Sequence, residues 1–279
     1  MTTATTPRYS SPTLTMEVDH AGVAMVHMHD VAGKNAFSRA FVAELVRVLG
    51  ELAHPTVKVA VLCGLDDVFS AGGDREVLMG LATGDVAPYD LLLTRSLLEV
   101  PVPTIAAMAG HAVGGGLVFG LSADLAVLGR QSRYGLNFME MGFTPGMGTT
   151  RLVQAAFGEY LAAEMMFGCQ YFKGTQLEGR VLVNGVLDRA EVLPRAMDIA
   201  SRMAEKPRHA LELLKRTLGL PRRKAFEEAR TLESLMHEIC FTRPETQARI
   251  AADYVAFTGA EPSTRGPSDS TDPTHTRGQ

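Results

Sequence analysis

The chain has 279 residues, which is enough for one large α/β domain or two small ones. Hydrophobic residues make up 46% and charged residues 21% of the composition, as is usual for a soluble protein with a buried core. The formal net charge of -4 provides no basic footprint, which excludes nucleic acid as an expected partner.

The start of the chain and its cysteines indicate where the protein works. Residues 1–13 are polar and lack the apolar stretch of a signal peptide, so we predict a disordered, unprocessed N-terminus. No apolar run approaches the roughly 18 residues of a membrane span. Cys63, Cys169 and Cys240 have no metal-binding spacing and are expected to be reduced, buried thiols. The sequence therefore predicts a cytoplasmic protein without a metal site or a membrane segment.

Short apolar runs and one clear helical pattern alternate in the first half of the chain. The helical pattern covers residues 38–52, with Ser38 as the expected N-cap. The apolar runs predict strands over residues 23–28, 57–63, 104–109 and 125–128.

Beyond about Tyr160 the patterns become mostly helical, over residues 159–168, 190–205, 208–218 and 222–240. Strands with helices first and helices alone later predict an α/β core over residues 14–200 and a helical region over residues 201–258. Residues 259–279 are rich in Pro, Ser, Thr and Gly, and we predict a disordered tail there.

Two glycine-rich segments follow predicted strands, FSAGGDR at residues 69–75 and GHAVGGGL at residues 110–117. A tight strand-to-helix turn is the ordinary interpretation of such segments. Neither the Walker A motif nor the dinucleotide-binding fingerprint is present, which argues against a phosphate cradle. Glycine also lets a backbone amide approach a reacting group closely, and two such amides can form an oxyanion hole.

The segments FSAGGD, PVPTIAAMAGHAVGGGLVFGLSADLAVL and GFTPGMGTTRL together resemble the crotonase (enoyl-CoA hydratase/isomerase) superfamily, from about Val18 to Phe257. The resemblance implies an α/β fold of repeated ββα units, a helical C-terminal trimerisation region, and a homotrimer or hexamer. It also implies that the amides of Gly73 and Gly115 form the oxyanion hole. Ala36 and Ala71 correspond to backbone positions that contact the pantetheine or adenine end of an acyl thioester.

The two glutamates that activate water in hydratases of this superfamily have no counterpart here. Val118 and Phe138 occupy their positions, and neither can hold or deliver a proton. Phe138 is instead expected to line the acyl site. Glu140 lies two residues further and could act as a base only in a different loop register. The sequence therefore predicts enolate chemistry without hydration.

A narrower resemblance, carried by NFMEMGFTPGMG and MHEICFTRPETQARI, is to the decarboxylase of polyketide β-branching cassettes. It implies conversion of 3-methylglutaconyl on an acyl carrier protein to 3-methylcrotonyl, with oxyanion stabilisation of a dienolate. His237 matches the histidine that faces the site in that family. The family also has a lysine after the first glycine loop, but no lysine lies between Lys58 and Lys173 here. Arg75 is the cation available to orient the substrate carboxylate, unless it pairs with a neighbouring acidic residue.

Two alternatives stay open: an enoyl thioester isomerase, and a catalytically silent homologue that only binds a carrier protein. No cofactor is expected beyond the phosphopantetheine or CoA that carries the substrate. Arg222, Arg223 and Lys224 could contact an acidic carrier protein, although such a triplet is usually a solvated helix end. His111, just before the second glycine loop, is expected to be structural.

Overall fold

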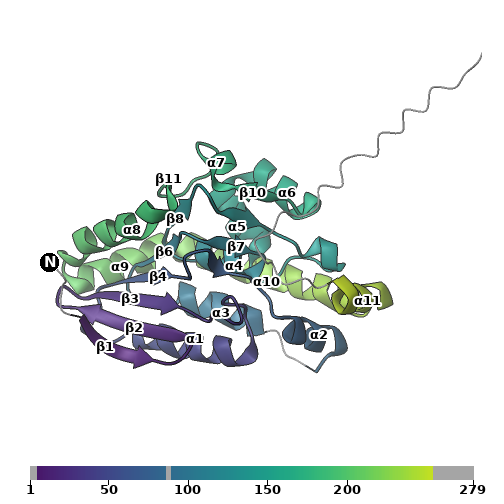
Figure 1. The fold of residues 1–279 in the computed structure, drawn as a ribbon, viewed down its shortest axis with the longest axis horizontal. Coiled ribbons are helices and arrows are strands. Elements are labelled where there is room, and N and C mark those ends of the chain that lie inside the picture. The colour runs from purple at the N-terminus through teal and green to yellow at the C-terminus, as the bar shows by residue number, and fades with distance from the viewer. Residues whose placement is uncertain (1–4, 86–88, 254–279) are drawn as a thin grey trace, which may run out of the picture.

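The computed structural model describes residues 5–85 and 89–253, and Figure 1 shows their arrangement. A large sheet has the strand order β1-β2-β3-β4-β6-β8-β11. Its strands are β1 (Thr5–Ser10), β2 (Leu14–Asp19), β3 (Val23–Met28), β4 (Val59–Cys63), β6 (Thr104–Met108), β8 (Leu125–Gly129) and β11 (Val186–Leu187). The pairs from β3 to β11 are parallel, whereas β1, β2 and β3 pair antiparallel at one edge.

A smaller sheet has the order β10-β9-β7-β5 and consists of β5 (Val68–Ser70), β7 (His111–Val113), β9 (Arg133–Gly135) and β10 (Tyr171–Lys173). Three pairs of strands are consecutive along the chain: β4 and β5, β6 and β7, and β8 and β9. In each pair the first strand belongs to the large sheet and the second to the small sheet. A helix or helical turn follows each pair along the chain. This arrangement confirms the predicted α/β fold of repeated ββα units.

The helices before the C-terminal region are α1 (Arg39–Glu51), α2 (Arg75–Thr83), α3 (Tyr89–Leu98), α4 (Gly115–Leu121), the 3-10 turn η1 (Met139–Met141), α5 (Thr149–Phe157), α6 (Glu159–Gly168) and α7 (Gly174–Leu177). Then come α8 (Arg189–Ala204), α9 (Arg208–Leu218), α10 (Leu220–Phe241) and α11 (Pro244–Asp253). In Figure 1, α2 and α11 lie at the end of the molecule remote from α8 and α9. Helix α10 passes the glycine loops near its C-terminal end and brings His237 and Phe241 beside them.

The large sheet is buried on both faces, which explains why its central strands are continuous apolar runs. Along β4, Ala60 and Leu62 join the main core, while Val59, Val61 and Cys63 pack in a second cluster with α8. Burial raises the pKa of the Cys63 thiol to about 12, so this cysteine is a packing residue and not a nucleophile.

The predicted strands and helices that could be compared are confirmed within two residues at each end. Ser38 is the N-cap of α1, where its side chain accepts a hydrogen bond from the backbone N–H of Phe41. The spacing of apolar residues that predicted α1 is the spacing of its buried face, which includes Phe41 and Leu45.

The prediction that residues 1–13 are disordered is wrong for most of that segment. Residues 5–10 form β1, which pairs with β2, and Tyr9 packs against the core beneath the guanidinium of Arg47. Threonine and tyrosine favour strands, and the ladder to β2 supplies backbone hydrogen bonds that composition alone does not reveal. The predicted tail over residues 259–279 lies outside the described residues.

Candidate active site

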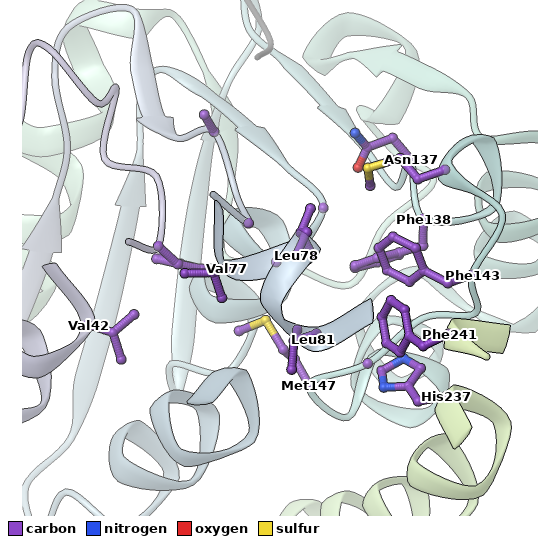
Figure 2. A pocket seen from close by; sticks show the side chains of 17 residues that line it. Val42, Val77, Leu78, Leu81, Asn137, Phe138, Phe143, Met147, His237 and Phe241 are labelled. Atoms are coloured by element: carbon purple, nitrogen blue, oxygen red, sulfur yellow. The ribbon is translucent and has the colours of Figure 1, made fainter. Parts of the chain in front are cut away.

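A pocket lies between the two glycine loops, α2, η1 and α10 (Figure 2). Its lining residues are mostly apolar: Phe37, Val42, Ala71, Gly73, Val77, Leu78, Leu81, Gly114, Gly115, Asn137, Phe138, Met141, Phe143, Gly146, Met147, His237 and Phe241. Among these, only Asn137 and His237 carry side chains that can form strong hydrogen bonds. The site therefore combines an apolar cavity with few polar groups, the usual composition of a small-molecule site.

The two predicted glycine loops meet at this pocket. Gly72 has φ +85°, and a Cβ placed on it would lie 2.5 Å from the carbonyl oxygen of Val113 and 3.2 Å from the nitrogen of Gly115. No side chain can fit between backbones that approach so closely. The motif positions that are far apart in the sequence, Gly73 and Gly115, are therefore brought to one end of the small sheet and both line the pocket.

The amide of Gly115 opens helix α4, so its N–H has no partner within that helix. Gly114, just before it, has φ +52° and ψ -124°, a conformation that favours glycine. A Cβ on Gly115 would lie 2.7 Å from the sulfur of Met147, so any larger residue there would require the Met147 side chain to shift. In the other loop, Gly73 forms an isolated parallel β-bridge with Phe37. It directly precedes Asp74, the N-cap of α2.

His237 reaches the same pocket from α10, 122 residues further along the chain than Gly115 by their numbers. Its Nε2 lies 2.8 Å from the carbonyl oxygen of Thr144. A carbonyl can only accept, so Nε2 carries a hydrogen and donates it. Nδ1 is then the ring nitrogen that can gain or lose a proton. The ring packs against Phe143 and Phe241, with centroid distances of 6.2 and 5.1 Å.

A buried carboxylate one helical turn before His237 holds α10 against α5. Glu233 is fully buried and accepts hydrogen bonds from the N–H groups of Gly148 and Thr150 and from the Thr150 hydroxyl. Burial raises the pKa of Glu233, while these donors and the nearby His237 oppose that rise. The contact fixes the end of the Thr144–Gly148 segment, which supplies the carbonyl that binds His237. Nothing in the sequence pattern singled out Glu233.

The structure places the other predicted site residues at different distances from the pocket. Ala71 and Phe138 line the pocket as expected. Ala36 is buried behind Phe37 and is not among the lining residues. Arg75, which we predicted to orient the substrate carboxylate, does not line the pocket, and its guanidinium donates to the backbone carbonyl of Ala251 on α11. Arg75 turns toward α11, which lies beside the start of α2, and its role toward the substrate carboxylate stays a prediction.

No carboxylate lines this pocket in the described part of the chain. Val118 is fully buried within α4, and the ring of Phe138 occupies the second glutamate position at the pocket wall. Glu140 belongs to η1 but is not a lining residue, and its backbone carbonyl accepts a hydrogen bond from Arg249 on α11. The pocket therefore has no acid/base pair of glutamates with which to activate water.

The enclosed volume of the pocket is about 60 Å³, whereas small-molecule sites usually measure roughly 300 Å³ or more. Its wall on α2 is joined to α11 by two side chains, because Gln247 donates to the carbonyl of Ala82 and Arg75 to that of Ala251. These two hydrogen bonds fix α2 against α11 at the side of the pocket.

Asn137 is a lining residue that sequence analysis missed. It lies two residues after the end of β9, and β9 pairs in parallel with β7, which leads into the second glycine loop. The strand pairing therefore sets the Asn137 side chain beside Gly114. Its position directly before Phe138 was the available signal, since Phe138 occupies a catalytic position of the family.

Within the basic cluster near residue 222, Lys224 is exposed but Arg222 is engaged in contacts inside the fold. Arg222 donates to the carbonyls of Leu121, Ser122 and Ala123 at the end of α4 and lies 3.8 Å from Asp124. It therefore holds the start of α10 to the end of α4.

Among the described residues, no group of three or more His, Cys, Asp or Glu side chains could hold a metal ion. Within that same part of the chain, no helix is long and apolar enough to cross a membrane.

The fold and the paired glycine loops define an enzyme superfamily. The family profile described as "Enoyl-CoA hydratase/isomerase" matches residues 19–255. The chain therefore belongs to the enoyl-CoA hydratase/isomerase family, also called the crotonase superfamily, as its sequence motifs predicted.

Its relatives include decarboxylases. The chain is 39% identical over 240 residues to the bacillaene synthase decarboxylase PksI of Bacillus subtilis, covering 86% of this chain and 96% of PksI. A solved structure from a dehydratase/decarboxylase enzyme couple involved in polyketide β-branching has a TM-score of 0.85 and 36% identity, covering 90% of this chain and all of that chain. The ECH2 decarboxylase domain of CurF from Lyngbya majuscula has a TM-score of 0.81 and 33% identity, covering 86% of this chain and 99% of the domain. The predicted similarity to decarboxylases of polyketide β-branching is confirmed.

Proposed function

We propose that this enzyme decarboxylates a 3-methylglutaconyl thioester carried on an acyl carrier protein, giving 3-methylcrotonyl in polyketide β-branching. The observation that carries the proposal is the pocket itself. It keeps both glycine loops and a histidine, yet no carboxylate lines it within the described chain. Such a site can stabilise an enolate and move one proton, but it cannot activate water as a hydratase does. The similarity to PksI supports the same assignment.

The chemistry follows from the charge that develops during loss of CO2. The bond between the carboxylate and the adjacent carbon breaks, and its electron pair moves through the conjugated double bond onto the thioester oxygen. In the proposed mechanism, the amides of Gly73 and Gly115 donate hydrogen bonds to that oxygen as its negative charge grows. Preorganised backbone donors stabilise this charge more than that of the neutral thioester, which lowers the barrier.

His237 completes the reaction by supplying one proton. Because Nε2 donates to Thr144, the proton to be transferred is on Nδ1 of the imidazolium. Its delivery to the carbon that lost CO2 forms the new C–H bond, and the electron pair returns from oxygen to restore the thioester. The carbonyl of Thr144 fixes the orientation of the ring during this transfer.

We further infer that the subunits form a homotrimer or hexamer. The chain exposes seven large apolar side chains along α9 and α10: Leu213, Leu214, Leu218, Leu220, Leu232, Leu235 and Ile239. Exposed apolar side chains gathered on two adjoining helices are typical of an association surface.

The proposed activity is tested by trapping CO2 from 3-methylglutaconyl thioesters, presented both on a carrier protein and on CoA. Stoichiometric CO2 with 3-methylcrotonyl as the product would support the decarboxylase. A shifted double bond without CO2 would identify an isomerase instead. A bound but unchanged carrier protein would identify a catalytically silent homologue. The ratio of turnover on the two carriers tells whether the carrier protein itself is recognised.

A further inference from the structure

The Asn137 side chain presents a carboxamide to an otherwise mostly apolar pocket. It is partly buried and lines the pocket, and its carboxamide forms no hydrogen bond with any other residue of the described segments. Its Oδ1 would lie 2.9 Å from a Cβ placed on Gly114, so the missing side chain of that glycine makes room for the carboxamide. The carboxamide therefore lies beside the loop whose next amide is that of Gly115.

The substrate presents two polar ends to this pocket, a thioester oxygen and a carboxylate. A carboxylate placed among apolar side chains without a hydrogen-bond donor would be strongly destabilised. The amides of Gly73 and Gly115 are committed to the thioester oxygen, and the Nε2–H of His237 is committed to Thr144. Arg75, the cation nearest in sequence to Gly73 in this loop, is not among the lining residues and donates to Ala251. Among the lining side chains, this leaves the carboxamide of Asn137.

We propose that Asn137 determines specificity by donating a hydrogen bond from its Nδ2 to the substrate carboxylate. The inference rests on the proposed function, since it names the group that recognises the carboxylate of that substrate. Asn137 and His237 both line this pocket. The carbon that loses CO2 must lie within reach of both side chains, since it first carries the carboxylate and then receives the proton.

A neutral donor suits a carboxylate that has to leave. A full ion pair would stabilise the bound carboxylate more than the transition state, in which its charge has moved toward the thioester oxygen. A carboxamide can orient the carboxylate through a neutral hydrogen bond, which stabilises the bound carboxylate less than an ion pair would. This difference accounts for a site that works without the lysine of the related decarboxylases.

The test compares two ligands that differ only in the carboxylate. The 3-methylglutaryl and isovaleryl groups, each carried on the same acyl carrier protein, lack the conjugated double bond and cannot decarboxylate through a dienolate. Calorimetry gives the ratio of their dissociation constants for the wild type, Asn137→Leu and Asn137→Ala. We expect wild type to favour the 3-methylglutaryl carrier by about tenfold or more. Both variants should bring the ratio close to one while keeping the affinity for isovaleryl.

His237→Ala is the matched control, because it alters the other polar side chain of the pocket. It should abolish turnover yet keep the preference for the carboxylate. The inference is overturned if the wild type shows no preference, if both Asn137 variants retain it, or if His237→Ala is the change that removes it. Asn137→Ala adds no bulk and answers the question if the leucine variant does not fold. Failure of the proposed function looks different, since a wild type that prefers the carboxylate but releases no CO2 from 3-methylglutaconyl contradicts only the reaction.

Discussion

At the residue scale, the proposed chemistry of the pocket is divided among backbone amides, an imidazole and a carboxamide. The motif singled out His237, and the structure places it at the pocket, with the Thr144 carbonyl accepting a hydrogen bond from its Nε2. Arg75 illustrates the limit of motif reasoning, because its partner Ala251 lies 176 residues further along the chain. A side chain next to a glycine loop can turn either toward the pocket or toward another helix, and only tertiary packing decides.

Glu140 provides a test at the residue scale. Glu140 or His237 would serve as the base of an isomerase, but Glu140 is not among the residues that line the pocket. Glu140→Gln should therefore change kcat/KM for decarboxylation by less than about threefold, since surface substitutions usually have small effects. The rate of CO2 release from 3-methylglutaconyl carrier protein measures this. A loss of tenfold or more, with the variant still folded, would mean that the carboxylate reaches the substrate and that the isomerase alternative regains support.

At the scale of elements, the small sheet positions the two glycine loops. Its strands β5, β7 and β9 have three residues each, too few to show the alternation by which longer strands were predicted. The glycine motifs indicated the loops at the ends of β5 and β7, but the pairing of β7 with β9 had no sequence signal. That pairing brings Asn137 beside Gly114, and the only sequence signal for it was its place directly before Phe138.

His111 connects β7 to β9 and should make stability depend on pH. The backbone N–H of Arg133 donates to Nδ1 of His111, which must be unprotonated to accept. Burial lowers the pKa of His111, and Arg189, Arg133 and Lys34 lower it further while Asp67 opposes them. The folded state therefore disfavours the protonated form. Stability should be fully present above the usual histidine pKa of about 6.5 and should be lost as the pH falls through the lower pKa of the folded protein.

The replacement His111→Asn should remove this component of the pH dependence, because asparagine offers an acceptor oxygen but does not titrate in this range. Urea unfolding at pH values from about 7.5 down to about 5, a range that spans the usual histidine pKa, gives the free energy of unfolding of both proteins. His209→Asn, at an exposed position in the first turn of α9, controls for the loss of one imidazole. An unchanged slope in His111→Asn would show that the acid sensitivity originates elsewhere.

At the scale of the whole molecule, the long C-terminal helices serve both the site and the surface. Helix α10 carries His237 toward the pocket and exposes Leu235 and Ile239 on its outer side. The sequence predicted a helical C-terminal region from its apolar spacing, but α11 and its contacts with α2 were not predicted. Two of these contacts are hydrogen bonds from a side chain to a distant backbone carbonyl, Gln247 to Ala82 and Arg75 to Ala251, and a backbone acceptor leaves no residue pattern in the sequence.

Association through α9 and α10 can be tested by placing a charge on the apolar surface. Leu218 is 67% exposed, so Leu218→Glu should fold normally but disrupt an oligomer by burying a charge at the interface. Light scattering after size exclusion should show a shift from trimer or hexamer to smaller species. Val31→Glu, at a position 73% exposed outside these helices, is the control. A monomeric wild type, or an unchanged mass for Leu218→Glu, would contradict this assignment.

The central claim is tested most directly by intact-mass measurement of a 3-methylglutaconyl acyl carrier protein incubated with wild type and with His237→Ala. The account predicts that wild type removes the mass of one CO2 and that the variant does so at least about a hundredfold more slowly while remaining folded. An unchanged mass with wild type would contradict decarboxylation. Equal rates for the two proteins would contradict the role of His237 as the proton donor.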